Sequence, residues 1–179
     1  MFLLMLHVLC VIGAAIGIAF ADLSLFRGRQ VDMGLLRTGS RLVTGMLGLL
    51  WVTGLLIIWI DTGFELAVIA AKPKLVAKVS VAMLLTVNGH LLHRCFFSVL
   101  SQPLVNARRA ANVAAVMAAV SGASWLCAGF LGLAKPLAAF VDLSGFATIY
   151  LVLLCLCGLG VSRWVHPRLL RIYRHQRTA

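Results

Sequence analysis

Long apolar stretches alternate with short polar segments along the whole chain, and five of these stretches have the length of a membrane-spanning helix. The hydrocarbon core of a bilayer requires about 20 mostly apolar residues of a helix. We expect spanning helices over residues 2–21, 42–60, 73–97, 110–133 and 137–165. The pattern therefore predicts an all-α protein, a polytopic integral membrane bundle of five transmembrane helices.

The polar segments between and after the spans carry most of the charged residues. Residues 22–41 are predicted to form a basic loop, with residues 23–26 left open as an extension of the first helix into the interface. Pro73 fits the first turn of the third span. Residues 166–179 contain many arginines and are predicted to form a short basic helix at the membrane surface. We therefore expect residues 1–165 to form a single five-helix transmembrane domain, followed by a basic cytoplasmic tail.

The composition excludes a water-soluble domain. Hydrophobic residues make up 62% of the chain and charged residues 12%, and the mean hydropathy is +1.03. Soluble domains do not reach such values, so lipid is the expected solvent. The formal net charge of +11 would ordinarily indicate nucleic-acid binding. The basic residues fall between and after the apolar runs, however, so we expect them to set the topology and expect no nucleic-acid partner.

Lysine and arginine are divided unequally between the two sides of the predicted bundle. Five spans place alternate loops on opposite sides of the bilayer, so that the arginines share one side and the lysines share the other. The arginine side carries Arg27, Arg29, Arg37, Arg41, Arg94, Arg108, Arg109, Arg163, Arg168, Arg171, Arg174 and Arg177, and the lysine side carries Lys72, Lys74, Lys78 and Lys135. Cytoplasmic loops carry the excess of basic residues, which predicts an outside N-terminus and a cytoplasmic C-terminus. The expected location is a bacterial-type cytoplasmic (inner) membrane.

Two histidines near the arginine end of the third span are candidate ligands. An ionisable side chain inside a span is costly and usually faces the bundle interior or a water-filled cavity. At about 100° per residue, His90 and His93 lie on one polar stripe of the helix, and Asp22 is the natural carboxylate partner on the same side. A site of two histidines and one carboxylate can bind a metal ion or relay a proton. The alternative is a pair of interfacial histidines that hydrogen-bond to lipid or backbone.

His7 lies in the first span, near the opposite boundary of the membrane. At ~1.5 Å per residue it lies roughly 9 Å inside the outer boundary and His90 roughly 22 Å from it, so the two are not expected to hold one haem. Lys78 is close to His7 in depth, and together they define an outward-facing polar pocket for a propionate, a metal or a proton. For Lys78 the alternative is a lysine that extends its ammonium group to the membrane surface.

Other intramembrane residues are interpreted as packing residues. Asn88 is expected to tie two helices together, since a side-chain amide needs a hydrogen-bond partner in hydrocarbon. Gly13 and Gly17 of the first span are expected to allow close helix approach. The second span contributes Gly45, Gly48 and Gly54 to such packing, and the fourth repeats small residues at every fourth position, namely Ala110, Ala114, Ala118 and Gly122.

Short motifs in the first three spans resemble a known family. They are Leu6-His7-Val8-Leu9, Ser40-Arg41-Leu42, Thr53-Gly54, and Lys74-x-x-x-Lys78 followed by Asn88. In this order they resemble the copper-resistance D membrane domain and, more distantly, the membrane protoporphyrinogen oxidase family, over residues 5–100. The resemblance implies a helical bundle of the inner membrane associated with copper uptake or resistance, or with a bound haem. It also implies that His7 is the ligand position, with Lys78 beside it.

These residues leave three functions open. The first is a small inner-membrane protein that handles a copper-like metal ion or haem through intramembrane His, Lys and Asp groups. The second is a membrane oxidoreductase with bound haem b, which needs an axial ligand such as His7. The third is a non-catalytic membrane subunit or scaffold, which would form a homo-oligomer or bind a partner membrane subunit. The sequence contains no nucleophile with a base, phosphate-binding loop or zinc-ligand spacing, so soluble-type enzyme chemistry is not expected.

Overall fold

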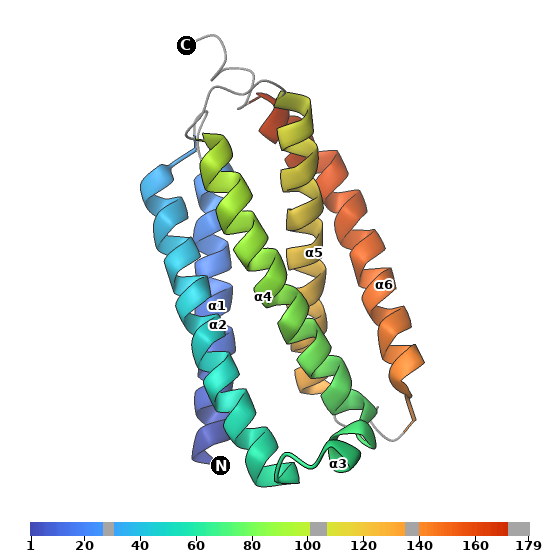
Figure 1. The fold of residues 1–179 in the computed structure, drawn as a ribbon. Coiled ribbons are helices and arrows are strands. Elements are labelled where there is room, and N and C mark those ends of the chain that lie inside the picture. The colour runs from blue at the N-terminus through green and yellow to red at the C-terminus, as the bar shows by residue number, and fades with distance from the viewer. Residues whose placement is uncertain (27–30, 101–106, 135–139, 172–179) are drawn as a thin grey trace. The chain divides into compact units, whose positions relative to one another are not determined.

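The computed structural model describes residues 1–26, 31–100, 107–134 and 140–171, and these are helical almost throughout (Figure 1). The elements are α1 (Phe2–Phe26), α2 (Met33–Thr62), α3 (Leu66–Ala70), α4 (Pro73–Leu100), α5 (Ala107–Leu133), α6 (Leu143–Gly160) and a π-helical turn (Val161–Val165). In this described part, five helices are long and apolar enough to cross a membrane, as the sequence predicts. The chain divides into two compact units, unit 1 (Met1–Ile69) and unit 2 (Ala70–Ala179), and the single-domain interpretation stays a prediction.

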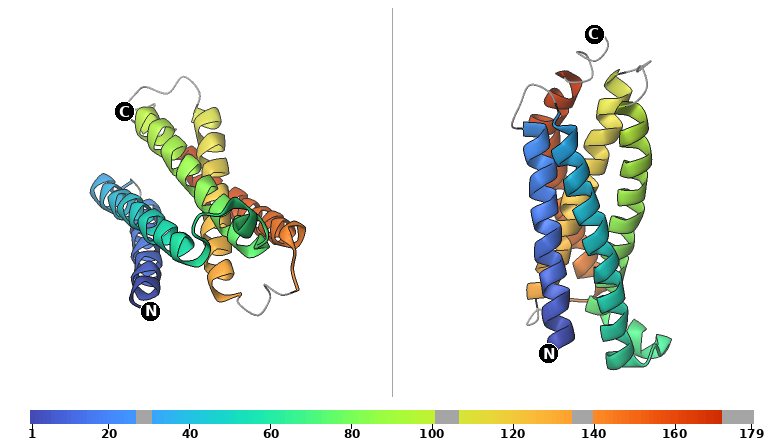
Figure 2. Two further views of the ribbon diagram at one scale, coloured as in Figure 1. Left: turned by 60° about the horizontal axis from the view of Figure 1, so that its bottom comes forward. Right: turned by 90° about the vertical axis from the view of Figure 1, so that its left-hand side faces the viewer.

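Unit 1 is a hairpin of two long antiparallel helices, α1 and α2, followed by the short α3 (Figure 2). The carboxylate of Asp32 caps the start of α2, because it accepts a hydrogen bond from the Leu35 N–H at 3.0 Å. Gly63 ends the helix with a left-handed φ of +59°, and its N–H donates to the Trp59 carbonyl at 2.8 Å. Local sequence therefore defines both ends of α2.

The predicted basic loop over residues 22–41 is wrong for most of its length. α1 runs on to Phe26, which is the extension that the sequence left open, and α2 already begins at Met33. The charges of this segment indicated a loop, yet the exposed Arg37 and Arg41 lie in the first turns of a 30-residue helix. At ~1.5 Å per residue, a helix of this length reaches about 45 Å, which is the thickness of a bilayer with its headgroups. The basic first turns of α2 therefore fit the interfacial region.

Glycines bring α1 and α2 close together. A Cβ on Gly39 would lie 2.6 Å from the carbonyl oxygen of Gly17. A Cβ on Gly17 would lie 2.8 Å from a methyl group of Val43, and one on Gly13 would lie 2.7 Å from Sδ of Met46. Gly13 and Gly17 thus lie in the contact between the two helices, a role for which small residues are suited in membranes.

Of the three α2 glycines that the sequence indicated, Gly54 lies beside α1, since a Cβ placed on it would be 3.5 Å from Cε1 of His7. Gly45 and Gly48 are exposed, and no described atom of a neighbouring element lies within 4 Å of a Cβ placed on either. Gly39 is buried against Gly17 instead. It lies in the segment that was predicted as a loop, and for that reason it was not among the expected packing residues.

Unit 2 contains α4, α5 and α6, and α5 packs against both of the others (Figure 1). The most buried stripe of α5 consists of Ala111, Ala115, Ala119, Ala123, Cys127 and Leu131. It lies next to the predicted stripe, of which Ala114 is buried while Ala118 and Gly122 are half-buried. Small residues repeat at every fourth position in both stripes. The sequence could therefore indicate that α5 has a small-residue packing face, but not which of the two stripes is the more buried.

α6 begins at Leu143 because Asp142 caps it. The carboxylate of Asp142 accepts hydrogen bonds from the Gly145 N–H at 2.8 Å and from the Ser144 hydroxyl at 2.9 Å. These bonds, the one from Gly145 above all, hold the pKa of Asp142 below its ordinary value of 3.8. The helix was predicted to begin at residue 137, which lies outside the described residues.

The predicted end of the last span at residue 165 is wrong. Beyond Gly160 the helix widens into the π turn, where the His166 N–H donates to the Val161 carbonyl, and it then continues as a helical segment to Arg171. Pro167 explains the widening, since proline has no N–H to donate and its ring clashes with the carbonyl four residues earlier. Residues 166–171 therefore continue the last helix, the rest of the predicted tail lies outside the described residues, and the division of the chain at residue 165 stays a prediction.

Candidate functional site

A histidine–threonine pair joins the two helices of unit 1 within their spanning segments. Nδ1 of His7 lies 2.7 Å from Oγ1 of Thr53. The same hydroxyl oxygen lies 2.8 Å from the carbonyl oxygen of Leu49 and 3.3 Å from that of Leu50, both on its own helix. Thr53 is only 2% exposed and His7 is half-buried, so the pair lies largely inside the hairpin.

The distances assign the hydrogen in each of these bonds. Two oxygen atoms 2.8 Å apart need a hydrogen between them, and the Leu49 carbonyl has none to give, so the Thr53 hydroxyl donates to it. The hydroxyl has a single hydrogen and therefore accepts from Nδ1 of His7, as inferred from the hydrogen-bond pattern. In the neutral ring, Nε2 then holds the lone pair that can bind a metal or accept a proton.

A hydrogen bond from Nδ1 to a fixed acceptor, as between His7 and Thr53, orients a histidine that binds a metal. In metal sites, the ring nitrogen that does not bind the metal usually donates its hydrogen to a fixed acceptor, which sets the tautomer and the ring orientation. Gly54 lies beside the ring, because a Cβ placed on it would be 3.5 Å from Cε1 of His7. The pair can therefore provide one axial ligand for a haem iron, one ligand for a metal ion, or a proton acceptor.

The other predicted ligands are distributed over both units. Asp22 is exposed on α1 in unit 1, whereas His90 and Lys78 are exposed on α4 in unit 2. The side chain of His93 lies outside the described part. Among the described residues, no three His, Cys, Asp or Glu side chains gather around a position for one metal ion. The site of two histidines and one carboxylate stays a prediction, as does the pairing of His7 with Lys78.

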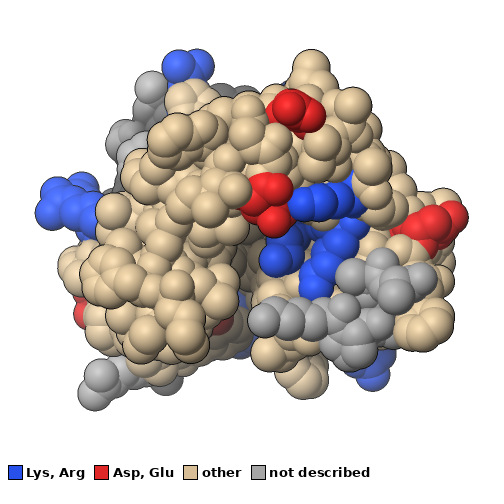
Figure 3. Space-filling model, turned by 90° about the horizontal axis from the view of Figure 1, so that it is seen from below, with Lys and Arg blue, Asp and Glu red and all other residues tan. Residues whose placement is uncertain are grey.

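The start of α4 concentrates basic side chains at one end of unit 2. Lys72 and Lys74 are half-buried there, and Lys78 is exposed. Figure 3 looks onto this end and shows neighbouring basic side chains gathered into one group. Lysines with partly covered stems and charged ends near a helix terminus are typical of residues that reach for the membrane surface.

Asn88 joins α4 to α5 in unit 2. Its Nδ2 donates to the backbone carbonyl of Met117 at 3.0 Å, and the residue is only 8% exposed. The bond satisfies an amide hydrogen that would otherwise meet hydrocarbon. Asn88 therefore contributes to helix packing in this unit.

Two polar contacts between helices of unit 2 were not predicted. Nε2 of His166 lies 2.7 Å from Oδ1 of Asn112, and the hydroxyl oxygens of Ser124 and Tyr150 lie 3.1 Å apart. An amide oxygen only accepts, so Nε2 of His166 is the donor. The sequence pattern placed His166 in the basic tail, where no partner was expected. His166 and Asn112 are polar residues near the ends of apolar helices, and this polarity was the available signal for their contact.

Comparisons with known protein families, with curated proteins and with solved structures found no match.

Proposed function

We propose that the chain is a small multi-pass protein of a bacterial-type inner membrane that binds haem b, with Nε2 of His7 as an axial ligand. The observation that carries the proposal is the 2.7 Å contact between Nδ1 of His7 and Oγ1 of Thr53. This contact favours the tautomer and ring orientation that ligation of a haem iron needs. The resemblance to families associated with copper or haem points to the same histidine.

The residues around His7 fit a haem better than a bare copper-like ion. A metal ion held by protein alone needs several converging ligands, and in the described ranges no three His, Cys, Asp or Glu side chains converge. A porphyrin brings its own nitrogen ligands, so a single imidazole suffices to attach it. The apolar character of α1 and α2 also suits a flat apolar macrocycle. When bound, a haem would supply one-electron transfer.

His7 and Thr53 have different roles in the proposed haem site. His7 would hold the iron through Nε2. Thr53 holds the imidazole by accepting its Nδ1–H, and the Leu49 carbonyl in turn fixes the threonine hydroxyl at 2.8 Å. Thr53 is thus a positioning residue and not a ligand.

The proposal includes the orientation of the chain in the membrane. The first turns of α2 and α5 carry exposed arginines, whereas the first turns of α4 carry lysines. In an alternating bundle α2 and α5 begin on the same side and α4 begins on the other. The positive-inside rule makes the arginine side cytoplasmic, which puts the N-terminus outside and the C-terminus in the cytoplasm.

The test is the absorption spectrum of the full-length protein, purified in detergent from a haem-sufficient host and recorded oxidised and reduced. The wild type is expected to carry haem b and His7→Ala to carry none. His166→Ala is the matched control, because His166 is also a hydrogen-bonded interhelical histidine, with a 2.7 Å contact to Asn112. This variant should keep the haem.

A featureless spectrum of the wild type, or equal haem content in wild type and His7→Ala, would contradict the proposal. His7 would then be a packing residue that ties α1 to α2 through Thr53. In that case the chain is better described as a membrane scaffold or a non-catalytic subunit.

A further inference from the structure

The end of unit 1 at which α2 passes into α3 exposes large apolar side chains. They are Trp59, Ile60, Phe64 and Leu66, and we call them the apolar turn. Phe2 at the start of α1 is exposed at the same end, because His7 pairs with Thr53 near the end of α2. Contiguous exposed apolar side chains mark a surface that binds a partner or a membrane. The apolar turn is therefore a candidate interaction surface.

Phe64 lies in this turn with a backbone conformation that phenylalanine rarely adopts. Its φ is +62°, and the φ of Gly63 before it is +59°. A residue with a Cβ is strained in this left-handed region, which glycine and asparagine tolerate best. The Phe64 side chain is nonetheless 50% exposed, so packing within the chain covers only half of it. A strained backbone that presents an exposed ring indicates a function for the ring at that surface.

Hydrogen bonds hold the strained turn in place. The Thr62 hydroxyl donates to the Ile58 carbonyl at 2.7 Å and accepts the Phe64 N–H at 3.3 Å. The Glu65 N–H donates to the Thr62 carbonyl at 3.0 Å, which closes the turn. Thr62 itself is buried. The end of α2 therefore fixes the direction in which the Phe64 side chain leaves the backbone.

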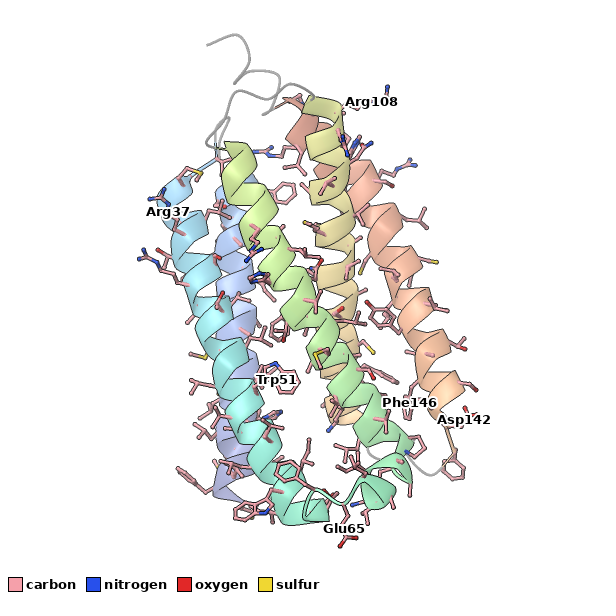
Figure 4. All side chains as sticks on the ribbon, viewed as in Figure 1. Arg37, Trp51, Glu65, Arg108, Asp142 and Phe146 are labelled. Carbon is pink, nitrogen blue, oxygen red and sulfur yellow. The ribbon has the colours of Figure 1, made fainter. Side chains whose placement is uncertain are left out.

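The length of α2 places the apolar turn at a membrane boundary. From the exposed Arg41 to the exposed Asp61, about 20 residues of helix rise roughly 30 Å at ~1.5 Å per residue, which is the thickness of the hydrocarbon core. Figure 4 shows charged side chains at both ends of unit 1, Arg37 near the start of α2 and Glu65 in the turn. With the arginines in one headgroup layer, the turn reaches the other.

The apolar turn also continues the exposed surface of the predicted span. From Gly48 to Ile60 the exposed residues of α2 are all apolar, the large ones being Leu49, Val52, Leu55, Leu56, Trp59 and Ile60. In a spanning helix such a surface faces lipid. Lipid is therefore the occupant that this continuity favours for the turn as well.

We propose that the apolar turn is an anchor that lies between the headgroups and the hydrocarbon of the leaflet opposite the arginines of α2. Trp59 and Phe64 contact the acyl chains, and the exposed carboxylate of Glu65 stays in water. The anchor sets the depth of α2 and holds Thr53 about 14 Å from Thr62, inside the boundary, at ~1.5 Å per residue. The proposal rests on the proposed membrane insertion of unit 1, but not on haem binding.

The first experiment locates position 64 by the fluorescence of the full chain in nanodiscs. The native tryptophans are replaced by Phe, and F64W or, as a matched control within the span, V52W supplies the reporter. The lipid is phosphatidylcholine with a nitroxide quencher near the start or near the end of the acyl chain, and iodide is the quencher in water. F64W is expected to be quenched most by the nitroxide near the start of the chain, and V52W most by the one near its end.

The second experiment tests whether the ring anchors the turn. Trp59 is kept as the reporter, the other tryptophans are replaced by Phe, and F64N is compared with F64L. Asparagine tolerates the left-handed backbone but is polar, whereas leucine is apolar and strained as phenylalanine is. F64N should shift the quenching of Trp59 from the nitroxide to iodide, and F64L should leave it unchanged. If F64N does not stay helical and monodisperse, L66N removes another apolar side chain of the turn and should produce the same shift.

Several outcomes overturn the proposal. Quenching of F64W by iodide alone would place the turn in water, and quenching by neither iodide nor nitroxide would show that protein, such as a second copy of the chain, covers it. Unchanged quenching of Trp59 in folded F64N, or an equal shift in F64L, would show that the ring is not an anchor. If V52W is not quenched by the lipid either, unit 1 is not inserted, and the proposed membrane location fails together with the anchor.

Discussion

Gly17 of α1 and Gly39 of α2 pack backbone against backbone: a Cβ added to Gly39 would lie 2.6 Å from the carbonyl oxygen of Gly17. A carbonyl oxygen is part of the helix backbone and cannot rotate away as the end of a side chain can. Because lipid is as apolar as the helices, their association depends on close packing of this kind and on interhelical hydrogen bonds. The hairpin therefore depends on two glycines, one in each helix.

Gly39→Ala is expected to destabilise unit 1 by about 1–3 kcal/mol, because the added methyl group forces the two backbones apart. Gly45→Ala is the matched control on the same helix, since no described atom of a neighbouring element lies within 4 Å of its Cβ position. It should be neutral or slightly stabilising, because alanine favours the helix more than glycine does. Chemical unfolding in detergent, followed by circular dichroism, measures both. Equal effects of the two variants would show that the close approach contributes nothing to stability.

Asn88→Ala is expected to lower the free energy of unfolding of unit 2 by about 0.5–1.5 kcal/mol, which is the range of interhelical hydrogen bonds in membranes. The variant removes the donor to the Met117 carbonyl, 3.0 Å away. Thr148→Val is the control, because the exposed Thr148 hydroxyl bonds the Ser144 carbonyl of its own helix. The same unfolding assay applies, and a loss for Thr148→Val as large as that for Asn88→Ala would argue against a specific role of the α4–α5 bond.

The cap of α6 predicts a pH dependence of stability. Hydrogen bonds from Gly145 and Ser144 lower the pKa of Asp142 in the folded chain, so the cap contributes fully above the ordinary aspartate pKa of 3.8. Its contribution is lost as the pH falls below 3.8 and through the lower folded pKa. Asp142→Ala should therefore be less stable than the wild type at neutral pH, and the difference should shrink in acid. A difference that stays constant with pH in unfolding titrations would contradict the ionised cap.

The topology predicts the behaviour of reporter fusions at the C-terminus. A green fluorescent protein fused after Ala179 should fluoresce, and a periplasm-dependent alkaline phosphatase at the same position should be inactive. Replacing the arginines of the first turns of α2 by Gln should weaken this bias, whereas replacing Lys72 and Lys74 should not. An active phosphatase on the unaltered chain would reverse the assigned orientation.

The five spans could be predicted because length and apolar character are local properties of the sequence. The ends of the helices were predicted less accurately than the spans. Arg37 and Arg41 suggested a loop, but a helix longer than the hydrocarbon core places charged first turns at the interface. The arginines after Val165 indicated a separate tail, yet the helix continues through the π turn to Arg171, and the contact of His166 with Asn112 holds it against a second helix.

The candidate site, like the helices, could be predicted only in part from the sequence. His7 could be singled out because an ionisable side chain within a span is rare and costly. Thr53 belonged to one of the family motifs, but its pairing with His7 could not be predicted, because a threonine in an apolar helix ordinarily bonds its own backbone, as it does here with Leu49. Which threonine also faces the histidine depends on the rotation and register of α1 against α2. Gly17 and Gly39 pack against each other in that register, and Gly39 was taken for a loop residue.

Thr53→Val tests the positioning role on which the proposed function depends. Valine has the same shape but accepts no hydrogen bond, so Nδ1 of His7 loses its acceptor at 2.7 Å while the helix contact is kept. We expect haem affinity to fall roughly ten- to a hundredfold, as it does when the partner of a ligating histidine is removed, and the reduction potential to shift. Thr53→Ser restores the hydroxyl and should bind like the wild type. Absorbance titrations of the apoprotein with haem, and redox titrations of the loaded protein, measure the two effects. Wild-type affinity and potential in Thr53→Val would show that the threonine does not position a ligand, even if His7→Ala abolishes binding.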